Sequence, residues 1–409
     1  MKVHRVHIKN FKSIVDMRLE LAPVNVFIGE NGSGKSNILE ALAFASAAAA
    51  DKLDNEFLVS RGIRVTDPHF MRSAFARSSE DPIFIDVEDE HGFRVFFNIT
   101  TLEDTAYPRW ISSPAVGFVS RDSGSTPLDD SFVTEFMDAV RSRIRPKLGE
   151  IKSAVDGLQD SESAKKETEV LSSVFSLVKS RMAQSVAPFP LRDFVIYSPE
   201  VSALRTFEKE GQILPLGTRG EGLLKLLRVL AKEDQEGWHA LQHNLGLLDW
   251  LLGIEIDHDS TLSEQSIRIR DRFLADGQPA FDQRSANEGF LYLLFFFALI
   301  LSKATPRFFA IENVDTSLNP KACSELMHRL ATLAIERERQ ILFTTHNPSL
   351  LDGLNLHDDK QRLFVVFRNR DGHTCVRRIM PPEPVGDELP VKLSEAFTRG
   401  LLGGIPQNF

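Results

Sequence analysis

The chain has 409 residues, 42% of them hydrophobic and 26% charged, and a formal net charge of −9 at pH 7. This composition is typical of a globular protein with two or three structural units, and it excludes a chain that is basic throughout. The two cysteines lack metal-type spacing and do not suggest a disulfide framework. The start lacks an apolar signal-peptide core, and the longest apolar run, 290–301, is too short to span a membrane. We therefore expect a cytoplasmic protein.

The first segments predict a small lobe built on strands. Residues 2–9 alternate between polar and apolar side chains, and residues 15–21 continue as a partner strand. Two further strands are expected within 81–100, joined by a turn at His91-Gly92. We assign residues 1–101 to this first lobe, a mixed sheet with one central helix.

A glycine-rich loop within this lobe reads GENGSGKS, residues 29–36. It follows an apolar run typical of a buried strand, residues 24–28, and precedes a segment rich in Ala and Leu that favours a helix. Glycines let backbone N–H groups converge on a polyphosphate, Lys35 is placed to reach the outer phosphates, and Ser36 to hold Mg²⁺. The order strand, loop, helix therefore predicts a phosphate loop for ATP and Mg²⁺, and a plain glycine turn is the alternative.

The pattern changes over residues 102–252, which we assign to a mostly helical insertion. Helices are expected over 129–144, 162–182 and 220–233, with a short strand at 194–200. No heptad pattern is sustained, so these segments do not predict a coiled coil.

The α/β pattern returns over residues 253–409, the second lobe. Its expected strands alternate with helices, which indicates a mainly parallel sheet. The strands are 254–258, 265–270, 307–313, 340–346, 362–369 and 374–379. The helices are 286–303, 319–337, one from Pro348 and one over 389–401.

Polar side chains stand at the ends of two of these strands. Glu312 and Asn313 follow the apolar run Phe308–Ile311, and His346 ends the run that begins at residue 340. Because ligands bind at the carboxyl edge of a parallel sheet, Glu312 is the candidate Mg²⁺ ligand and His346 the candidate contact to a γ-phosphate. Ser285 and Gly289 flank the start of the long apolar helix, where they form either an anion site or an ordinary helix cap.

These motifs, in this order, resemble the ABC-type ATPase heads of the RecF/SMC/OLD-like branch. The matching stretches are IKNFKSI, GENGSGKS, SANEG, FFAIEN, TSLNP and TTHNP, within about residues 1–50 and 280–350. The chain is also similar to the small stand-alone AAA-type ATPases of prokaryotic defence or genome-maintenance operons. The resemblance implies an α/β fold, an ABC-type P-loop ATPase head with mixed and parallel sheets and a helical insertion.

The resemblance also implies roles for particular residues. Two heads would face each other with ATP between them, each head contributing Ser285 and Gly289 to the γ-phosphate of its partner's ATP, with residues 317–319 along the seam. Ser36 and Glu312 would hold the metal, and His346 would sense the γ-phosphate. The residues around the nucleotide would be Lys12, Gly29, Glu30, Asn31, Gly32, Ser33, Gly34, Lys35, Ser36 and Asn37.

Two departures from the family pattern affect the expected chemistry. The family usually has Asp then Glu at the strand end, whereas this chain has Glu312 then Asn313. Since an amide orients water but cannot accept its proton, we predict slow hydrolysis, with Asp315 as the candidate acid. A Gln loop is not recognisable after the first lobe, where residues 68–75 occupy the corresponding region.

Three functions stay open at this stage. The first is an ATPase that forms a homodimer or larger homo-oligomer and gates a separately encoded effector, such as a nuclease, in anti-phage defence. The second is a RecF-like DNA-repair clamp, for which the basic segments 141–147 and 179–182 are the best candidates, although solvated helix faces explain them too. The third is a nucleotide-dependent scaffold with little turnover.

Overall fold

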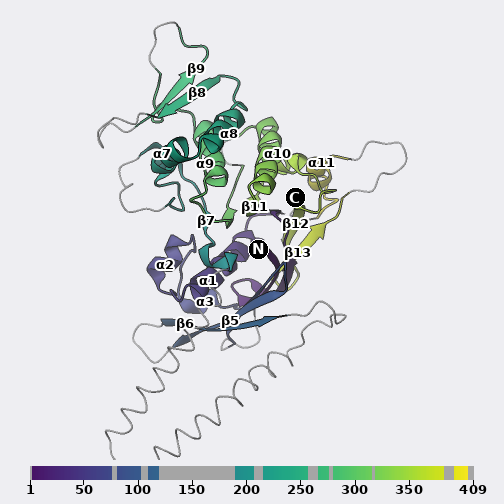
Figure 1. Cartoon of the computed structure of the whole chain (residues 1–409). Helices are drawn as coiled ribbons and strands as arrows, with labels where there is room; N and C mark the ends of the chain where they lie inside the picture. Colours follow the sequence, from purple (N-terminus) through teal and green to yellow (C-terminus); the bar gives the residue numbers. More distant parts are fainter. Residues whose placement is uncertain are drawn as a thin grey trace, which may run out of the picture.

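The computed structural model describes residues 2–75, 81–102, 109–118, 189–206, 215–256, 266–275, 280–315, 318–381 and 391–403. Two main sheets and the helices between and around them make up this part of the chain (Figure 1). The expected helices at 129–144 and 162–182, and the basic segments 141–147 and 179–182, lie outside the described residues.

The first sheet is antiparallel, with the strand order β2-β1-β4-β5-β6. Its strands are β1 (Val3–Phe11), β2 (Ile14–Glu20), β4 (Ile83–Asp89), β5 (Phe93–Leu102) and β6 (Arg109–Phe118). The strands expected at 2–9, 15–21 and within 81–100 are confirmed. The sheet continues past residue 101, because β6 pairs with β5 from Arg109 to Phe118.

The second sheet has the order β13-β12-β3-β11-β10-β7, parallel from β12 to β7 with β13 antiparallel at one edge. Its strands are β3 (Val24–Ile28), β7 (Ile196–Tyr197), β10 (Phe308–Ile311), β11 (Gln340–Thr345), β12 (Gln361–Arg368) and β13 (Thr374–Ile379). The mixed and parallel sheets predicted from the sequence are therefore present. The strands β12, β3, β11 and β10 end at one edge of the sheet, which is where ligands bind in such folds.

Helix α1 (Lys35–Ala49) lies between the two sheets, and its long run of small and apolar residues is almost entirely buried. The other face of the parallel sheet is covered by α9 (Glu288–Leu301) and α10 (Pro320–Glu336), with α7 (Leu223–Glu233) and α8 (Gln235–Leu245) packed outside them. Because α9 is apolar all round, it is a core helix, as its sequence predicts. Among the described residues, no helix is both long and apolar enough to cross a bilayer.

Shorter elements complete the described part of the chain. The helices are α2 (Asn55–Ser60), α3 (Pro68–Met71), α6 (Val201–Arg205) and α11 (Leu393–Thr398), and the 3₁₀ helices are η1 (Pro190–Asp193) and η2 (Pro348–Gly353). The strands β8 (Leu251–Ile256) and β9 (Ile267–Asp271) form a separate hairpin. The helix expected from Pro348 is thus a 3₁₀ helix, and the strand expected at 194–200 is only two residues long.

The parallel sheet separates two hydrophobic cores, and successive side chains of its strands point alternately into one core and the other. On β3, Val24, Val26 and Ile28 belong to the core under α9 and α10, whereas Phe27 packs in the core around α1. Such strands are buried on both faces, which explains why their sequences are continuous apolar runs.

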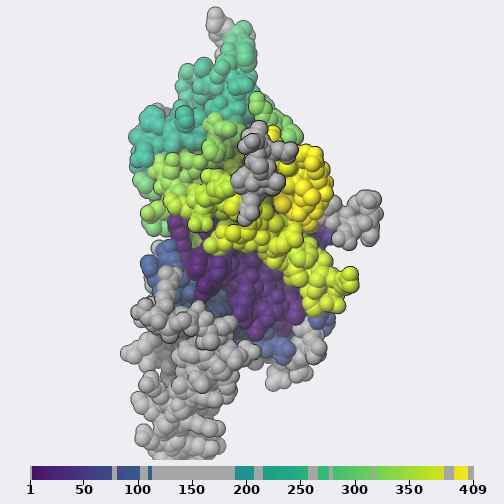
Figure 2. All heavy atoms as spheres, turned by 90° about the vertical axis from the view of Figure 1, so that its right-hand side faces the viewer, coloured from purple at the N-terminus to yellow at the C-terminus, as the bar shows by residue number. Residues whose placement is uncertain are grey.

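Segments from the two ends of the chain are interleaved. Figure 2 shows the C-terminal strands lying directly against the N-terminal residues, which are purple in that view. The buried amide of Gln340 joins the two sheets: its Oε1 accepts from Val3 N at 2.8 Å, and its Nε2 donates to Val3 O at 2.6 Å. The first and last thirds of the sequence therefore contribute strands to the same parallel sheet.

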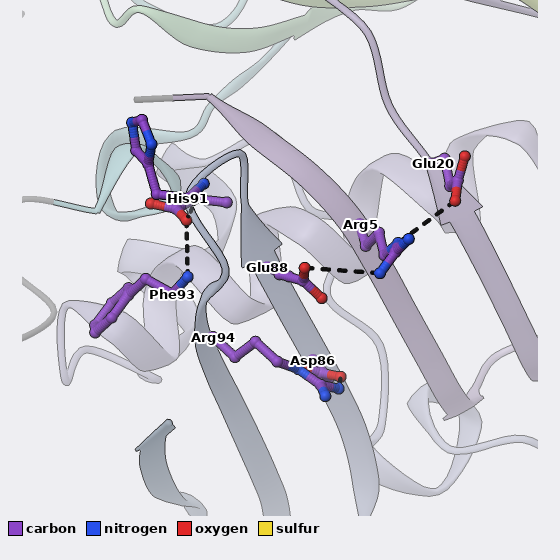
Figure 3. Close-up of polar contacts among 8 residues, drawn as sticks. Arg5, Glu20, Asp86, Glu88, His91, Phe93 and Arg94 are labelled. Carbon is purple, nitrogen blue, oxygen red and sulfur yellow. Dashed lines mark hydrogen bonds and ion pairs between the residues drawn. The ribbon is translucent and has the colours of Figure 1, made fainter. Parts of the chain in front are cut away.

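Charged pairs cross the strands of the antiparallel sheet on the face away from α1 (Figure 3). Arg5 lies between Glu20 at 3.4 Å and Glu88 at 3.7 Å, and Arg94 pairs with Asp86. Asp86 and Glu88 are less than 8% exposed although they sit on the polar face, because the long arginine side chains cover them. Alternation with the buried Ile85 fixes the register of β4.

Candidate functional site

The candidate site forms where four parallel strands end side by side. β3 leads into the phosphate loop, β11 into His346 and β10 into Glu312, while β12 ends at Arg368. The pairing of β12, β3, β11 and β10 in that order brings these ends together. Residues separated by more than 300 positions in the sequence thereby share one site.

Two glycines of the loop stand where a side chain would collide. A Cβ on Gly29 would lie 2.1 Å from Val366 O, and one on Gly34 would lie 2.1 Å from Thr374 Oγ1. Gly34 also has a φ of 105°, which an L side chain rarely adopts. Gly32 has a φ of 78° but faces open space, so its backbone is left accessible to a ligand. The sequence is therefore glycine-rich here for two reasons, close packing and left-handed torsions.

Lys35 is 5% exposed, and its ammonium points back into the loop. Its Nζ donates to Gly29 O at 2.8 Å and to Glu30 O at 2.9 Å. Burial lowers the pKa of Lys35 to about 8, and the nearby carboxylates of Glu312 and Asp315 counteract that shift. A desolvated ammonium without an ion-pair partner among the described residues is well placed to bind a strong anion.

The Ser36 hydroxyl donates a hydrogen bond to the Glu312 carboxylate. Glu312 is itself fixed by the main chain, since its N–H donates to Tyr197 O at 2.8 Å. A hydroxyl and a carboxylate at the start of the helix form a hard oxygen set of the kind that Mg²⁺ takes beside phosphates. Both residues predicted as metal ligands are thus brought together, next to Lys35.

His346, Asp315 and Thr345 form the wall opposite the loop. The Thr345 hydroxyl donates to Asp315 Oδ1 at 2.7 Å, so the β11 strand end holds that carboxylate in place. His346 is exposed, and Nδ1 lies 3.4 Å from Lys35 Nζ. Partial burial and the charge of Lys35 lower the pKa of His346, so its ring is neutral at pH 7.

Asn313 has a left-handed backbone with a φ of 53°, a conformation that asparagine tolerates better than most residues. Its N–H donates to Thr344 Oγ1 at 3.1 Å, which ties the turn after β10 to the neighbouring strand. The residue is exposed at the same edge as Glu312. An amide thus stands beside the candidate metal ligand, as the sequence predicts.

A hydrogen-bonded support behind the loop comes from a strand that sequence reasoning did not connect to the site. Thr374 Oγ1 donates to Ser33 O at 2.9 Å and lies 2.6 Å from Ser13 Oγ. Asn37 Nδ2 donates to Ser13 Oγ at 2.6 Å, so the first turn of α1 is tied to the β1–β2 turn. The side chain of Asn37 is therefore used in support of the loop.

Arg368 is a second residue that sequence reasoning missed. Its Nε donates to Gly32 O at 3.0 Å, and its guanidinium lies 5.8 Å from the centre of the Phe75 ring. The signal was available, because Arg368 ends an expected parallel strand just as Glu312 does. What the sequence did not show is that β12 pairs directly with β3.

Lys12 forms an ion pair with a residue of α1. Its ammonium pairs with Glu40, which also accepts from Arg64 Nε at 2.6 Å. Glu40 is 2% exposed in the middle of α1, so this cluster is a buried ion-pair network. The expected approach of Lys12 to the nucleotide stays a prediction.

The SANEG segment is a helix start, and its cap is Asn287, whose side chain accepts from Phe290 N at 2.8 Å. Ser285 lies before the cap, in a turn closed by Asp282, and Gly289 lies in the first turn of α9. Ser317 lies outside the described residues, and Asn319 caps α10 by accepting from Ala322 N at 2.9 Å. The part assigned to these residues in a dimer stays a prediction.

The residues of the loop fit a nucleotide with Mg²⁺. Gly32 leaves its backbone open to a ligand, Lys35 is desolvated inside the loop, and Ser33 Oγ is buried without a hydrogen-bond partner among the described residues. The helix N-terminus of α1 adds backbone N–H donors and its dipole. The remaining residues assigned to the nucleotide, Glu30 and Asn31, belong to the same loop and extend toward its exposed tip.

Comparison with protein families gives two matches. Residues 1–105 match the family described as "AAA ATPase domain", and residues 241–352 match the one described as "AAA domain, putative AbiEii toxin, Type IV TA system". The first contains the phosphate loop, and the second contains Glu312 and His346. Both halves of the site thus lie in segments similar to ATPase domains.

Individual proteins give a shorter likeness. Over 57 residues, the chain is 35% identical to the DNA replication and repair protein RecF of Lactococcus lactis subsp. cremoris and 39% identical to RecF of Clostridium botulinum. Each match spans 14% of this chain and only 16% of the RecF chain. The likeness therefore concerns a small part of those proteins.

Among solved structures, the SMC head bound to the C-winged helix domain of ScpA has a TM-score of 0.53 to this chain at 13% identity. The comparison covers 93% of this chain and 98% of that one. At such low identity the likeness concerns the fold alone.

Proposed function

Because the chain carries an ABC-type ATPase head of the RecF/SMC-like branch, we propose that it binds ATP and Mg²⁺ at the phosphate loop, dimerises around them and gates a partner effector. The observation that supports this best is the convergence of Lys35, Ser36 and Glu312 at one sheet edge. Lys35 would bind the outer phosphates, while Ser36 and Glu312 would hold Mg²⁺, which neutralises phosphate charge when bound.

The exposed surface of the site supports the proposed dimer. His346 and the loop tip at Asn31 and Gly32 face solvent, whereas Lys35 is buried behind them. A second head that brings Ser285 and Gly289 to this surface would place a helix N-terminus against the γ-phosphate. Without the polyanion, the phosphate loop of one head and the helix N-terminus of the other would repel each other, because both are electropositive. ATP would therefore act as the removable link between the heads.

Turnover is proposed to be slow. Asn313 stands where a proton acceptor is usual, and it can orient a water molecule without accepting its proton. Asp315 is the nearest alternative base, since it lies close enough to Lys35 and His346 to affect both pKa values. Its hydrogen bond from Thr345 fixes the carboxylate but leaves one oxygen for a water.

The biological setting is proposed from the second family match, whose description refers to a toxin of a type IV TA system. We place the protein in the cytoplasm as an anti-phage ATPase whose effector is a separate chain. We also propose three units: a first lobe over 1–101, an insertion over 102–252 and a second lobe over 253–409. In this arrangement, hydrolysis in the dimer releases or activates the effector.

Sedimentation velocity of the full chain tests the core of this proposal. With Mg-ATP we expect a monomer-to-dimer shift that is strongest for Asp315→Asn, in which hydrolysis is slowed, and absent for Lys35→Ala. Arg18→Ala, an exposed control on β2, should behave as wild type. A wild-type chain that stays monomeric at saturating Mg-ATP would rule the dimer out. Affinity capture with genomic neighbours then tests the effector.

A RecF-like DNA clamp is the second candidate, and it is favoured by the 57-residue likeness to RecF. It predicts DNA binding that requires ATP and weakens steeply with salt. A dimer with ATP but negligible turnover and no DNA binding would instead favour the scaffold role. These outcomes separate the three functions.

A further inference from the structure

A cavity of about 1070 Å³ lies beside β7 and shares no lining residue with the phosphate loop. Its walls come from α2, η1, residues 215–221 and the segment 304–307 between α9 and β10. Ligand sites usually occupy about 300–1,000 Å³, so the cavity is large enough for a small organic molecule. The nucleotide site described above does not account for it.

Tyr197 forms part of the cavity wall and is 1% exposed. Its ring packs against Phe295 and Phe309, with ring centres 6.0 and 5.8 Å away. Its hydroxyl has no hydrogen-bond partner in the described part of the chain, and burial raises its pKa. A phenol hydroxyl at the wall of a cavity can donate a hydrogen bond to a ligand there.

Two guanidinium groups line the same cavity without a carboxylate partner in the described chain. Arg61 donates to Phe194 O at 3.4 Å, and its nearest acid, Asp193, is beyond ion-pair distance. Arg307 stands exposed at the cavity, likewise outside any ion pair of the described residues. A third lining arginine, Arg219, is already paired with Glu200 at 3.4 Å. Arg61 and Arg307 are therefore available for an oxyanion.

An aromatic wall lies next to these cations. The Arg61 guanidinium lies over the Phe57 ring, 4.7 Å from its centre, and forms a cation–π pair with it. Planar guanidinium groups recognise phosphate with two parallel donors, and they also stack on heterocyclic rings. The cavity thus offers phosphate contacts and a ring contact within one enclosure.

We propose that this cavity is a second ligand site that binds a phosphate-bearing aromatic molecule of the mononucleotide class. Arg61, Arg307 and the Tyr197 hydroxyl hold the phosphate, and Phe57 lies against the base. The main chain connects this site to the first one, because Tyr197 O accepts the N–H of Glu312 at 2.8 Å. Its influence on turnover rests on the proposed ATPase function, whereas binding itself does not.

Calorimetric titration of the full chain with adenosine 5′-monophosphate tests the site. The titrations use the Lys35→Ala background, so that the phosphate loop does not take up the probe. We expect one bound molecule per chain, a Kd raised at least about 10-fold by Arg61→Ala with Arg307→Ala, and about 3- to 10-fold by Tyr197→Phe, in line with single hydrogen bonds. Arg18→Ala, a distant exposed control, should leave the Kd unchanged.

Three outcomes would overturn the proposal: no binding at millimolar probe, a Kd equal in all variants, or binding of a single-stranded oligonucleotide in place of the mononucleotide. Urea unfolding shows whether the variants fold. Tyr197→Phe should be no less stable than wild type, since it removes only a hydroxyl without a partner. Probe binding by the Lys35→Ala chain, together with no ATPase activity in the wild-type chain, would leave this site standing while the ATPase proposal fails.

Discussion

The ammonium of Lys35 lies 3.4 Å from Nδ1 of the His346 imidazole, at the point where β3 and β11 end side by side. Burial is the main cause that lowers the pKa of each group, and the positive charge of Lys35 further lowers that of His346. The pair therefore carries one proton rather than two at neutral pH. A triphosphate between them would favour the charged form of both, so the site is electrostatically ready for an anion.

Replacing Lys35 by Met should change how stability depends on pH. The folded pKa of about 8 lies below the ordinary 10.5, so the unfolded chain binds more protons between these pH values, and wild-type stability rises there with pH. Lys35→Met should remove that rise, which amounts to about 2–3 kcal/mol, and should be more stable than wild type at pH 7. Urea unfolding at pH 7 and pH 10 measures it.

The exposed Lys232→Met is the matched control and should keep the wild-type slope. In the same experiment, Mg-ATP at 100 times its Kd should stabilise wild type by about 2.7 kcal/mol and leave Lys35→Met unchanged. Equal stabilisation of both proteins by nucleotide would contradict the role of Lys35.

Two glycines of the loop should respond differently to alanine. Gly29→Ala places a Cβ 2.1 Å from the Val366 carbonyl, so a backbone must move, and we expect a loss of about 1–3 kcal/mol. Gly32→Ala meets open space and carries only the cost of its positive φ, about 1–2 kcal/mol. Nucleotide affinity should fall more for Gly29→Ala. Identical affinity in the two variants, measured by titration, would argue against the packed cradle.

Exchange of Asn313 for Glu should accelerate hydrolysis. The change supplies a proton acceptor where the chain has an amide, and general-base catalysis contributes about 10²–10⁴-fold in typical enzymes, so we expect at least about a 10-fold rise in kcat. Phosphate release under saturating Mg-ATP is the measurement. No gain in turnover would show that the local geometry at Asn313, with its φ of 53°, does not direct this side chain to the water.

Asp315→Asn tests the alternative base. Turnover should fall at least about 10-fold with little change in the affinity for ATP, because the carboxylate acts on the water rather than on the bound nucleotide. Asp16→Asn, which alters an exposed ion pair on β2, is the control and should keep wild-type kcat. If Asp315→Asn keeps full activity, the proton must go elsewhere.

Two substitutions in the ion-pair network of Glu40, Lys12 and Arg64 should lower the stability of the protein by different amounts. Glu40 is 2% exposed and pairs with Lys12 and Arg64, so Glu40→Gln leaves the nearly buried Lys12 charge without its carboxylate and should cost about 3 kcal/mol. Arg64 is 64% exposed, and Arg64→Ala should cost less than about 1 kcal/mol. Urea midpoints compare the two, and equal losses would contradict a buried network.

Sequence patterns predicted the parts of this fold that depend on local chemistry. The strands around 24–28, 307–313 and 340–346 are apolar runs. The loop that follows the first of them, residues 29–36, is a motif whose torsions need glycine. Each of these segments was therefore recognisable from its own sequence. The pairing order was not, because it depends on contacts between distant segments. Thr374 and Arg368 were missed for that reason: both support the loop from strands whose neighbours no local pattern reveals.

The helix start at Asn287 is a local feature that the sequence alone left ambiguous. Ser285 and Asn287 are both good cap residues, and sequence alone cannot decide which one takes that position. The structure selects Asn287, because its side chain accepts from Phe290 N and the preceding serine is held in a turn by Asp282. Competing local preferences were resolved here by the packing of α9.

The neighbours of β3 have a consequence for how the protein is made. Both strands that flank it, β11 and β12, come from residues beyond 339, so a nascent chain on the ribosome carries this apolar strand without partners until most of the polypeptide has emerged. Completion of the sheet is thus a late event in biosynthesis. Nucleotide capture should accordingly be impossible for any truncated translation product that stops before β11.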